Sequence, residues 1–501
     1  MKAAVKSNGW RAAALTVWLA FLFLCVGNSV STGLSYFDDA EMALVAQSLA
    51  HGTGYSLAPE ADVAERAQFQ PGISLGPALI VPCALILKVL GTKEVIPGLS
   101  AILIWGTVLT FLFFRVSRKV PATRLLAGTA VFCFSILAVF TWQFGAWYAF
   151  LGETTAAAFL LLGHWSLAME KLSLRWLFLS GLCLGLALQT KYLAALGILG
   201  AIAILLFRWR YSRDETNPSL LLLATWVIAF LLPTILFECW KWRELGSYSY
   251  ARDWTAFLEF SKSQGLVSGR RFSLGWERIA ALQENYSVNL VAFALLLLLS
   301  LRLALTRLTQ NWAWLFLGLL LSVLSLALYW IFFSIGLPRY LVIGMAMACF
   351  AMMVPVLGLS GLRGATFYIA LGAVVLVGGI IRIPATATRA ADHGLFKATA
   401  ERHARKKIVK AIRALKEPEP LVVGVVQRAE AFAIEFDLEQ KVKFQRVDSL
   451  GNLPGKKFVI THHLLGIPNK RAYIEDALHG PISSVILAAG PYELLTVNGP
   501  P

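Results

Sequence analysis

The sequence predicts an all-α polytopic membrane protein with about eleven spans, followed by a small α/β domain. Hydrophobic residues make up 57% of the 501 residues and charged residues only 15%. The mean hydropathy of +0.66 lies far above that of soluble domains. Long apolar segments fill residues 1–382, whereas charges and alternating patterns return in residues 383–501. The composition therefore excludes an ordinary soluble protein.

The net charge of +16 raises the question of a nucleic-acid partner. The Lys and Arg residues, however, are concentrated in short gaps between apolar segments, where the positive-inside rule places them. We therefore predict contact with membrane lipids and no nucleic-acid partner.

Apolar segments of spanning length follow one another along the first 382 residues. They lie at roughly 12–31, 72–90, 95–114, 122–140, 150–168, 175–190, 192–207, 219–238, 288–306, 312–333, 338–358 and 365–382. Basic residues cluster in the gaps near 115–124, 171–175, 208–213, 302–307 and 363. If these gaps and the basic N-terminus are cytoplasmic, residues 239–287 form an outer loop and residues 383–501 form an extracytoplasmic domain.

Segment 72–90 does not fit this alternation, because only one crossing is allowed between the first span and the gap at 115–124. Pro71, Pro77 and Pro82 interrupt its beginning, and proline removes a helix donor and clashes with the preceding turn. We therefore predict an interfacial or re-entrant element within a first outer loop at 32–94. The alternative is that every segment crosses and one basic gap breaks the rule.

The two ends of the chain need separate interpretation. Residues 1–30 resemble a signal peptide, but the weak cleavage site and the spans that follow favour an uncleaved first span. In the C-terminal domain, residues 397–416 are typical of a basic helix at the headgroups. Short strands are expected at 421–426, 441–447, 457–461 and 484–488, with helical stretches near 428–439 and 470–479.

Acidic residues follow the first span directly, in the motif Asp38-Asp39-Ala-Glu41. Ionisable residues at the edge of a span are functional candidates. The alternative is a solvated helix start, since Asp is favoured there by capping and by the helix dipole. Glu153 opens a later span on the same predicted face and has the same alternative explanation.

Two cations lie at the same predicted depth in the membrane as each other, on the face that carries the acidic residues. Lys191 occupies a tight turn between apolar segments, and Arg339 stands in Leu-Pro-Arg-Tyr340. Snorkelling of the long side chains to the headgroups is the alternative for both. Cations with carboxylates on one outer face suit a phosphate-bearing lipid donor, because cations stabilise the leaving phosphate and a carboxylate acts as general base.

The order of these motifs resembles the C-type (GT-C) glycosyltransferases. The likeness rests on a first span, an acidic motif opening a helix, a proline-containing amphipathic segment, Gly-Glu, Thr-Lys and Pro-Arg-Tyr, and it extends over residues 10–382. It is similar in particular to the family of protein O-mannosyltransferases and aminoarabinose-lipid A transferases. Such enzymes use a polyprenyl-phosphate-linked sugar on the outer face of the membrane.

The resemblance implies a role for each candidate residue. Asp38 corresponds to the catalytic base, Asp39 to the second acidic residue of that motif, and Glu153 to the acidic residue of the second outer loop. Lys191, Arg339 and Tyr340 correspond to residues that bind the lipid phosphate. The chain departs from the pattern at Phe69-Gln-Pro-Gly72, where aminoarabinose transferases have Glu-Lys-Pro-Pro.

The predicted function is therefore transfer of a sugar from a polyprenyl-phosphate donor to an extracytoplasmic lipid, glycan or protein, in a bacterial inner membrane. A polysaccharide polymerase or ligase and a lipid or sugar transporter remain the alternatives. A transporter would be expected to carry internal repeats, which the sequence lacks. No metal ligands and no cofactor are predicted from the residues, and a divalent cation stays open. The sugar and the acceptor are not specified.

Overall fold

The computed structural model describes a large part of the chain. The described residues are 2–34, 37–57, 67–69, 76–139, 147, 149–211, 220–263, 301–302, 308–333, 338–358, 395–415, 421–425, 431–439, 442–450, 456–462 and 470–498. The predicted spans at 288–306 and 365–382 lie almost entirely outside them.

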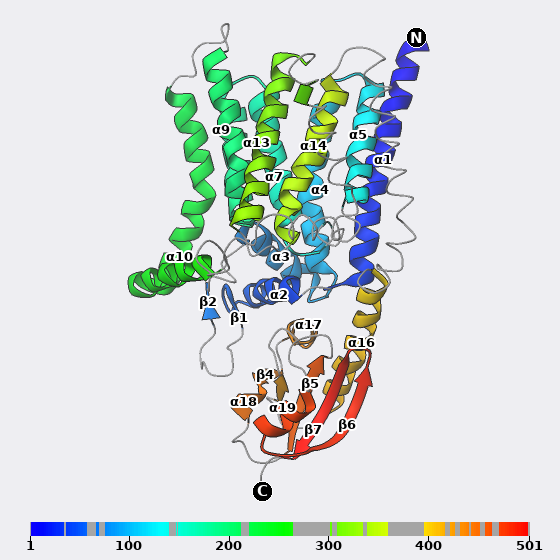
Figure 1. Ribbon diagram of the computed structural model, residues 1–501, viewed down its shortest axis with the longest axis vertical. Helices are drawn as coiled ribbons and strands as arrows, with labels where there is room; N and C mark the ends of the chain where they lie inside the picture. Colours follow the sequence, from blue (N-terminus) through cyan, green and yellow to red (C-terminus); the bar gives the residue numbers. More distant parts are fainter. Residues whose placement is uncertain are drawn as a thin grey trace.

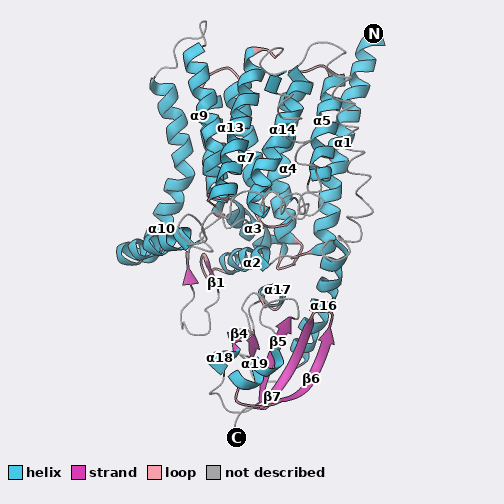
Figure 2. Ribbon diagram, viewed as in Figure 1, coloured by secondary structure: helices cyan, strands magenta, loops and turns pink. Residues whose placement is uncertain are grey.

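The described membrane part is a bundle of long helices, with the N-terminus at one end and the C-terminal domain beyond the other (Figures 1 and 2). Its helices are α1 (Lys2–Thr32), α4 (Ile96–Ser117), α5 (Ala122–Val139), α7 (Glu153–Met169), α8 (Leu174–Thr190), α9 (Ala194–Tyr211), α10 (Leu220–Ser263), α13 (Gln310–Phe332) and α14 (Val342–Gly358). Four helices among the described residues are long and apolar enough to cross a membrane: Asn8–Thr32, Ile96–Ser117, Leu220–Glu259 and Gln310–Phe332. Several apolar segments of the bundle are thus shorter as regular helices than their sequences suggest.

Helices α2 (Phe37–Ala50) and α3 (Pro77–Leu90) lie together beneath one end of the bundle (Figure 1). Helix α3 has 14 residues, which is about 21 Å of helix against a hydrocarbon core of about 30 Å. The helix in predicted segment 72–90 is therefore too short to cross by itself. We call this end of the bundle the α2/α3 end.

Glycines allow neighbouring helices of the bundle to touch through their backbones. Gly181 and Gly185 of α8 face α10, where an added Cβ would lie 2.3 Å from the carbonyl oxygens of Trp226 and Phe230. This four-residue spacing of small residues is typical of close helix crossings in membranes. The contact fixes how α8, and so the turn after it, sits against α10.

A buried polar group links three helices through hydrogen bonds. The ring of His164 in α7 lies 3.0 Å from Ser322 Oγ of α13, and Ser322 Oγ donates to Gly197 O of α9 at 2.6 Å. Because unsatisfied polar groups are costly in hydrocarbon, these bonds specify the relative register of α7, α9 and α13.

The C-terminal domain is a five-stranded sheet with helices packed against it (Figure 2). The strand order is β4-β3-β5-β7-β6; β3 is parallel to β4 and β5, and β7 is antiparallel to β5 and β6. The elements are α16 (Leu395–Ala414), β3 (Val422–Val425), α17 (Phe432–Asp437), β4 (Lys443–Arg446), α18 (Val447–Leu450), β5 (Lys456–His462), α19 (Lys470–Ala477), β6 (Ile482–Ala489) and β7 (Tyr492–Asn498).

Strands β3 to β6 lie where strands are expected from the sequence, whereas β7 was not expected. The basic helix predicted at 397–416 is α16, and its position relative to the headgroups stays a prediction. Its apolar face, with Ile408 and Ile412, packs into the core of the sheet, because the helix carries an apolar stripe that the sheet covers.

Ion pairs attach α16 to the α2/α3 end. Arg402 and Lys406 lie 2.6 and 2.8 Å from Oε1 of Glu94, in the α3–α4 loop, and Arg405 pairs with Oε2. Arg402 also donates to the last carbonyls of α1, at Val30 and Ser31. The C-terminal domain is therefore joined directly to the loops that surround α2.

Candidate active site

The acidic motif opens α2. The helix begins at Phe37, so Asp38 and Asp39 lie in its first turn, where the helix dipole stabilises negative charge. Asp39 is completely buried and Asp38 is half-buried. Both side chains have interactions within the protein. The structure thus agrees with a helix start and leaves Asp38 as the more accessible of the two carboxylates.

Glu153 and Lys191 form an ion pair at the same end of the bundle. Glu153 is the first residue of α7, Lys191 follows the last residue of α8, and Nζ of Lys191 lies 3.3 Å from Oε1 of Glu153. The side chains are 3% and 14% exposed. Among the described residues, Oε2 of Glu153 has no hydrogen-bond partner. The pair is nearly dry, so its electrostatic interaction is little screened by solvent.

The backbone around this pair is shaped by two glycines in the left-handed region. Gly152 (φ 85°) precedes α7, and an added Cβ would lie 3.2 Å from Thr190 Cγ2 and 3.4 Å from Lys191 Cε. Gly76 (φ 90°) precedes α3 and faces the carbonyl oxygen of Thr190. The N-termini of α3 and α7 therefore meet the turn that carries Lys191, and both helix dipoles point their positive ends to it.

Four aromatic rings connect the segments that carry Tyr55 and Phe69 with α10. Tyr55 stacks on Phe69 at 5.2 Å between ring centroids, and Phe69 lies edge-on to Trp240 at 5.3 Å. Phe237 contacts both Tyr55 and Trp240. Sequence reasoning missed this cluster, because its members lie far apart along the chain and belong to no spaced motif.

Helix α10 continues beyond its predicted end. Residues 239–287 were expected to form an outer loop, but the helix runs to Ser263 with a kink at Gly246 (φ 71°). Asp253 pairs with Lys241 across the kink, and the Tyr250 hydroxyl donates to Glu238 Oε2 at 3.0 Å. The prediction of a loop is thus wrong for residues 239–263.

The second half of α10 turns sideways and lies at the edge of the bundle, at the level of α2 and α3 (Figure 1). There Phe257 packs edge-on to Tyr192, the residue after Lys191, at 5.0 Å. From the sequence, only the apolar part of α10 before Gly246 was predicted as a helix. The part after Gly246 is richer in polar residues and was not predicted as one. The contact between Phe257 and Tyr192 packs the second half of α10 against the turn that carries Lys191.

Tyr340 lies in η1 (Pro338–Leu341), a short 3-10 helix between α13 and α14. Ser322 of α13 bonds to Gly197, which lies near the start of α9 and close to Lys191 in the chain. The end of α13, ten residues after Ser322, therefore lies at the same end of the bundle as Lys191. Tyr340 is half-buried and packs against the core of the bundle. The side chain of Arg339 lies outside the described residues, so its role stays a prediction.

The described candidate residues thus lie at one end of the bundle, but only some of them touch one another. Lys191 and Glu153 touch directly. Helix α2, which carries Asp38 and Asp39, shares an apolar cluster with Phe150, three residues before Glu153. In the described part of the chain, no three His, Cys, Asp or Glu side chains are grouped closely enough to hold a metal ion.

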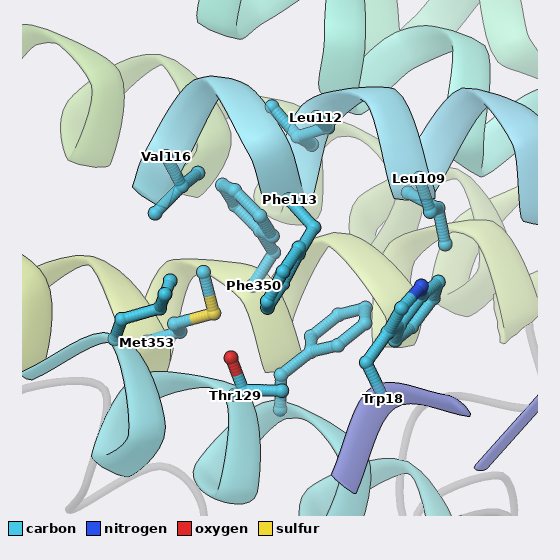
Figure 3. A pocket seen from close by; sticks show the side chains of 10 residues that line it. Trp18, Leu109, Leu112, Phe113, Val116, Thr129, Phe350 and Met353 are labelled. Carbon is cyan, nitrogen blue, oxygen red and sulfur yellow. The ribbon is translucent and has the colours of Figure 1, made fainter. Parts of the chain in front are cut away.

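A small cavity elsewhere in the bundle carries no such chemistry. It has a volume of about 30 Å³ and lies between α1, α4, α5 and α14. Figure 3 shows the described lining, in which the Thr129 hydroxyl and the Trp18 indole nitrogen lie among apolar side chains such as Phe350 and Met353. It is a packing space of about the size of one water molecule.

Comparison with known proteins gives a fold but no close relative. No protein-family model and no curated protein sequence matches the chain. The structure of ArnT from Cupriavidus metallidurans bound to undecaprenyl phosphate matches with a TM-score of 0.63 and 14% identity, over 99% of this chain and 100% of that one. The apo structure of ArnT matches over the full length of both chains, with a TM-score of 0.56 and 16% identity.

AglB, an oligosaccharyltransferase from Archaeoglobus fulgidus, matches at a TM-score of 0.44, which is too low to support an argument. ArnT, an aminoarabinose-lipid A transferase with the GT-C fold, was solved with undecaprenyl phosphate bound. At 14–16% identity the likeness to ArnT establishes the fold. The chain therefore has the GT-C fold of ArnT, and the resemblance predicted from the sequence is confirmed at the level of the fold.

Proposed function

We propose that the chain is a membrane glycosyltransferase that moves a sugar from a polyprenyl-phosphate donor to an extracytoplasmic acceptor. The observation that carries the proposal is the Lys191–Glu153 pair, which lies at the N-termini of α3 and α7 and at the same end as the acidic helix α2. The full-length likeness to ArnT, which was solved with undecaprenyl phosphate bound, supports it. A transporter is less well supported, because the described charges at this end suit catalysis on a phosphate ester.

The proposed reaction needs one base and one anion-binding group. Asp38 removes the proton from the acceptor hydroxyl or amine, whose lone pair attacks the anomeric carbon of the sugar. The bond between that carbon and the phosphate oxygen breaks, and polyprenyl phosphate leaves with the electron pair. Lys191 stabilises the leaving phosphate. Asp38 is preferred over Asp39 as the base because Asp39 is completely buried.

In this proposal Glu153 positions Lys191 and does not touch the sugar. The ammonium group of lysine has three donors, and Glu153 Oε1 lies 3.3 Å from it. Donors that do not face Glu153 are available to a phosphate. Arg339 and Tyr340 stay in the proposal as further phosphate-binding residues, on the resemblance.

The test compares Asp38→Asn with Asp39→Asn in purified protein, with a polyprenyl-phosphate sugar as donor. Release of polyprenyl phosphate is measured. Asp38→Asn should lower turnover at least about 100-fold, as loss of a general base does, while donor binding is retained. Near-normal turnover of Asp38→Asn would show that the base is assigned wrongly. In cells, loss of the gene should make the unused donor accumulate.

The orientation of the chain is also part of the proposal: the α2/α3 end and the C-terminal domain are extracytoplasmic. Cys239 is the one exposed cysteine in the described part of the chain, so single cysteines are introduced into a Cys239→Ser background. An impermeant thiol reagent added outside intact cells should label Lys407→Cys and leave Arg118→Cys unlabelled. The reverse pattern would overturn the orientation.

A further inference from the structure

A polar pocket lies at the far end of the bundle from α2 and α3. It has a volume of about 910 Å³ and opens where α7 ends and α8 begins. Glu170 follows α7 directly, 17 residues from Glu153, which is about 25 Å along the helix. The charged and aromatic residues lining it are Lys119, Glu170, Lys171, Arg175, Trp176 and Arg208. The pocket is therefore separate from the candidate active site.

Glu170, the carboxylate that the described residues contribute to this lining, is already paired. Arg115 lies 2.7 Å from Glu170 Oε1, and Lys119 lies 3.3 Å from Oε2. The buried Arg208 donates from Nη1 to the carbonyl oxygens of Leu167 and Glu170, both at 2.6 Å. Cations therefore neutralise the negative C-terminal end of the α7 dipole. The charge of Glu170 is already compensated by Arg115 and Lys119, so it compensates little of the charge of the other cations.

Two exposed cations, Lys171 and Arg175, lie at the rim of the pocket. In the described part of the chain, no carboxylate lies within ion-pair distance of Lys171 or Arg175. Both flank the N-terminus of α8, whose dipole adds positive potential. The pocket therefore combines a buried arginine, two exposed cations and a helix N-terminus, an arrangement that favours an anion with several oxygens.

An apolar surface continues from this pocket along α8. Leu174 and Phe178, one helical turn apart, are 48% and 41% exposed. The guanidinium groups of Arg115 and Arg175 lie 4.5 and 5.5 Å from the centroid of the Trp176 ring. A ligand that fits both parts has an anionic head and an apolar tail, which distinguishes a lipid from a free anion.

We propose that this pocket binds the phosphate of an anionic phospholipid, with an acyl chain along Leu174 and Phe178. Lys171 and Arg175 hold the phosphate, and Arg208 and Trp176 form the floor and wall of the site. Basic pockets between helices at a membrane surface bind anionic headgroups in this manner. The proposal does not depend on the activity proposed for the other end of the bundle.

The test measures lipid binding to the delipidated full-length protein in detergent micelles by native mass spectrometry. Phosphatidylglycerol is titrated against phosphatidylcholine, whose headgroup carries no net charge. The parent protein should prefer phosphatidylglycerol, and Lys171→Ala/Arg175→Ala should weaken that binding about 20-fold. Binding of phosphatidylcholine should not change.

The matched control removes two cations at the same end that do not line the pocket. Arg11→Ala/Arg118→Ala has the same net charge as the test variant and should retain the preference. Thermal unfolding of each variant checks that the fold is intact. Equal weakening by both double variants, or equal binding of the two lipids by the parent, would overturn the proposal.

A third arm separates a lipid from a soluble anion. Inorganic phosphate in large excess is added to the complex with phosphatidylglycerol. Because the acyl chain contributes part of the binding free energy, the lipid should stay bound. Complete displacement by inorganic phosphate would assign the pocket to a soluble phosphate compound and would contradict the proposal.

Discussion

At the residue scale, the Glu153–Lys191 pair decides how the candidate site is charged. The two side chains belong to different helices and are largely removed from solvent. Breaking a buried pair is costly because the remaining charge is left uncompensated. Each partner should therefore be sensitive to neutralisation, and Lys191 should be sensitive to geometry as well.

We expect Glu153→Gln to destabilise the protein by about 3 kcal/mol. Use of the donor should also weaken, because the ammonium group of Lys191 then has no carboxylate to position it. Thermal unfolding and donor titration measure the two effects. Lys191→Ala should raise the KM for the donor more than that for the acceptor, and Lys191→Arg should restore part of it. An equal loss for donor and acceptor would argue against a phosphate-binding role.

Gly152 offers a test of the backbone beside this pair. Gly152→Ala places a Cβ 3.2 Å from Thr190 at a φ of 85°, so both strain and crowding arise. Gly52→Ala is a matched control, since Gly52, in the turn that ends α2, has a φ of 81° and nothing within 4 Å of the added Cβ. Both should lose about 1 kcal/mol from strain, and Gly152→Ala should lose more. Equal unfolding temperatures would show that the contact with Thr190 is unimportant.

At the element scale, the packing of α8 on α10 sets the position of Lys191. Gly185 lies six residues before Lys191, and its Cα faces the backbone of Phe230. No side chain can be added there without moving a helix, because a carbonyl oxygen would lie 2.3 Å from the new Cβ. The kink in α10 at Gly246 then carries Phe257 over the next residue, Tyr192.

We expect Gly185→Ala to separate α8 from α10 and to lower thermal stability by about 2 kcal/mol, with loss of donor binding because the Lys191 turn shifts. Gly27→Ala in α1 is the control: nothing lies within 4 Å of its Cβ, so it should be neutral or slightly stabilising. If both variants unfold at the same temperature, the close approach of the two helices is not what holds them together.

At the scale of the whole molecule, Glu94 joins the membrane part to the C-terminal domain. Burial raises the pKa of this carboxyl, but Arg405, Lys406 and Arg402 outweigh it and hold the pKa below its ordinary value of 4.5. Helix α17 completes the junction: Gln47 of α2 donates to Phe436 O at 3.0 Å, and Phe432 packs in the same cluster as α2.

Because the pKa of Glu94 is lowered in the folded state, its stabilisation is present above about pH 4.5 and is lost as the pH falls through the folded value. Asp437, whose pKa is raised chiefly by burial, acts in the opposite direction, so it moderates the loss. We expect Glu94→Gln to increase proteolytic cleavage around α16 at pH 7, and this difference from the parent to shrink toward pH 4. A difference that does not depend on pH would contradict the role of the Glu94 charge.

Much of this architecture could be predicted from the sequence, because it follows from local composition. Apolar segments and basic gaps are compositional signals, and they predicted a membrane protein. The acidic helix start predicted α2, and the order of the motifs predicted the GT-C resemblance that the fold confirms. The β7 strand and the second half of α10 were missed. Strand β7 is held between β5 and β6, and the second half of α10 contacts Tyr192, so both depend on contacts with residues distant in the chain.

By itself, then, the sequence determined the class of protein, the order of its candidate residues and the short proline-containing α3, since these depend on hydropathy and backbone propensity. Only the tertiary structure decided that Glu153 meets Lys191, that the aromatic rings of residues 55 and 69 join α10, and that a basic pocket lies at the far end. Such contacts join residues far apart in the chain, and their energies arise from the packing of whole helices, which no local pattern encodes.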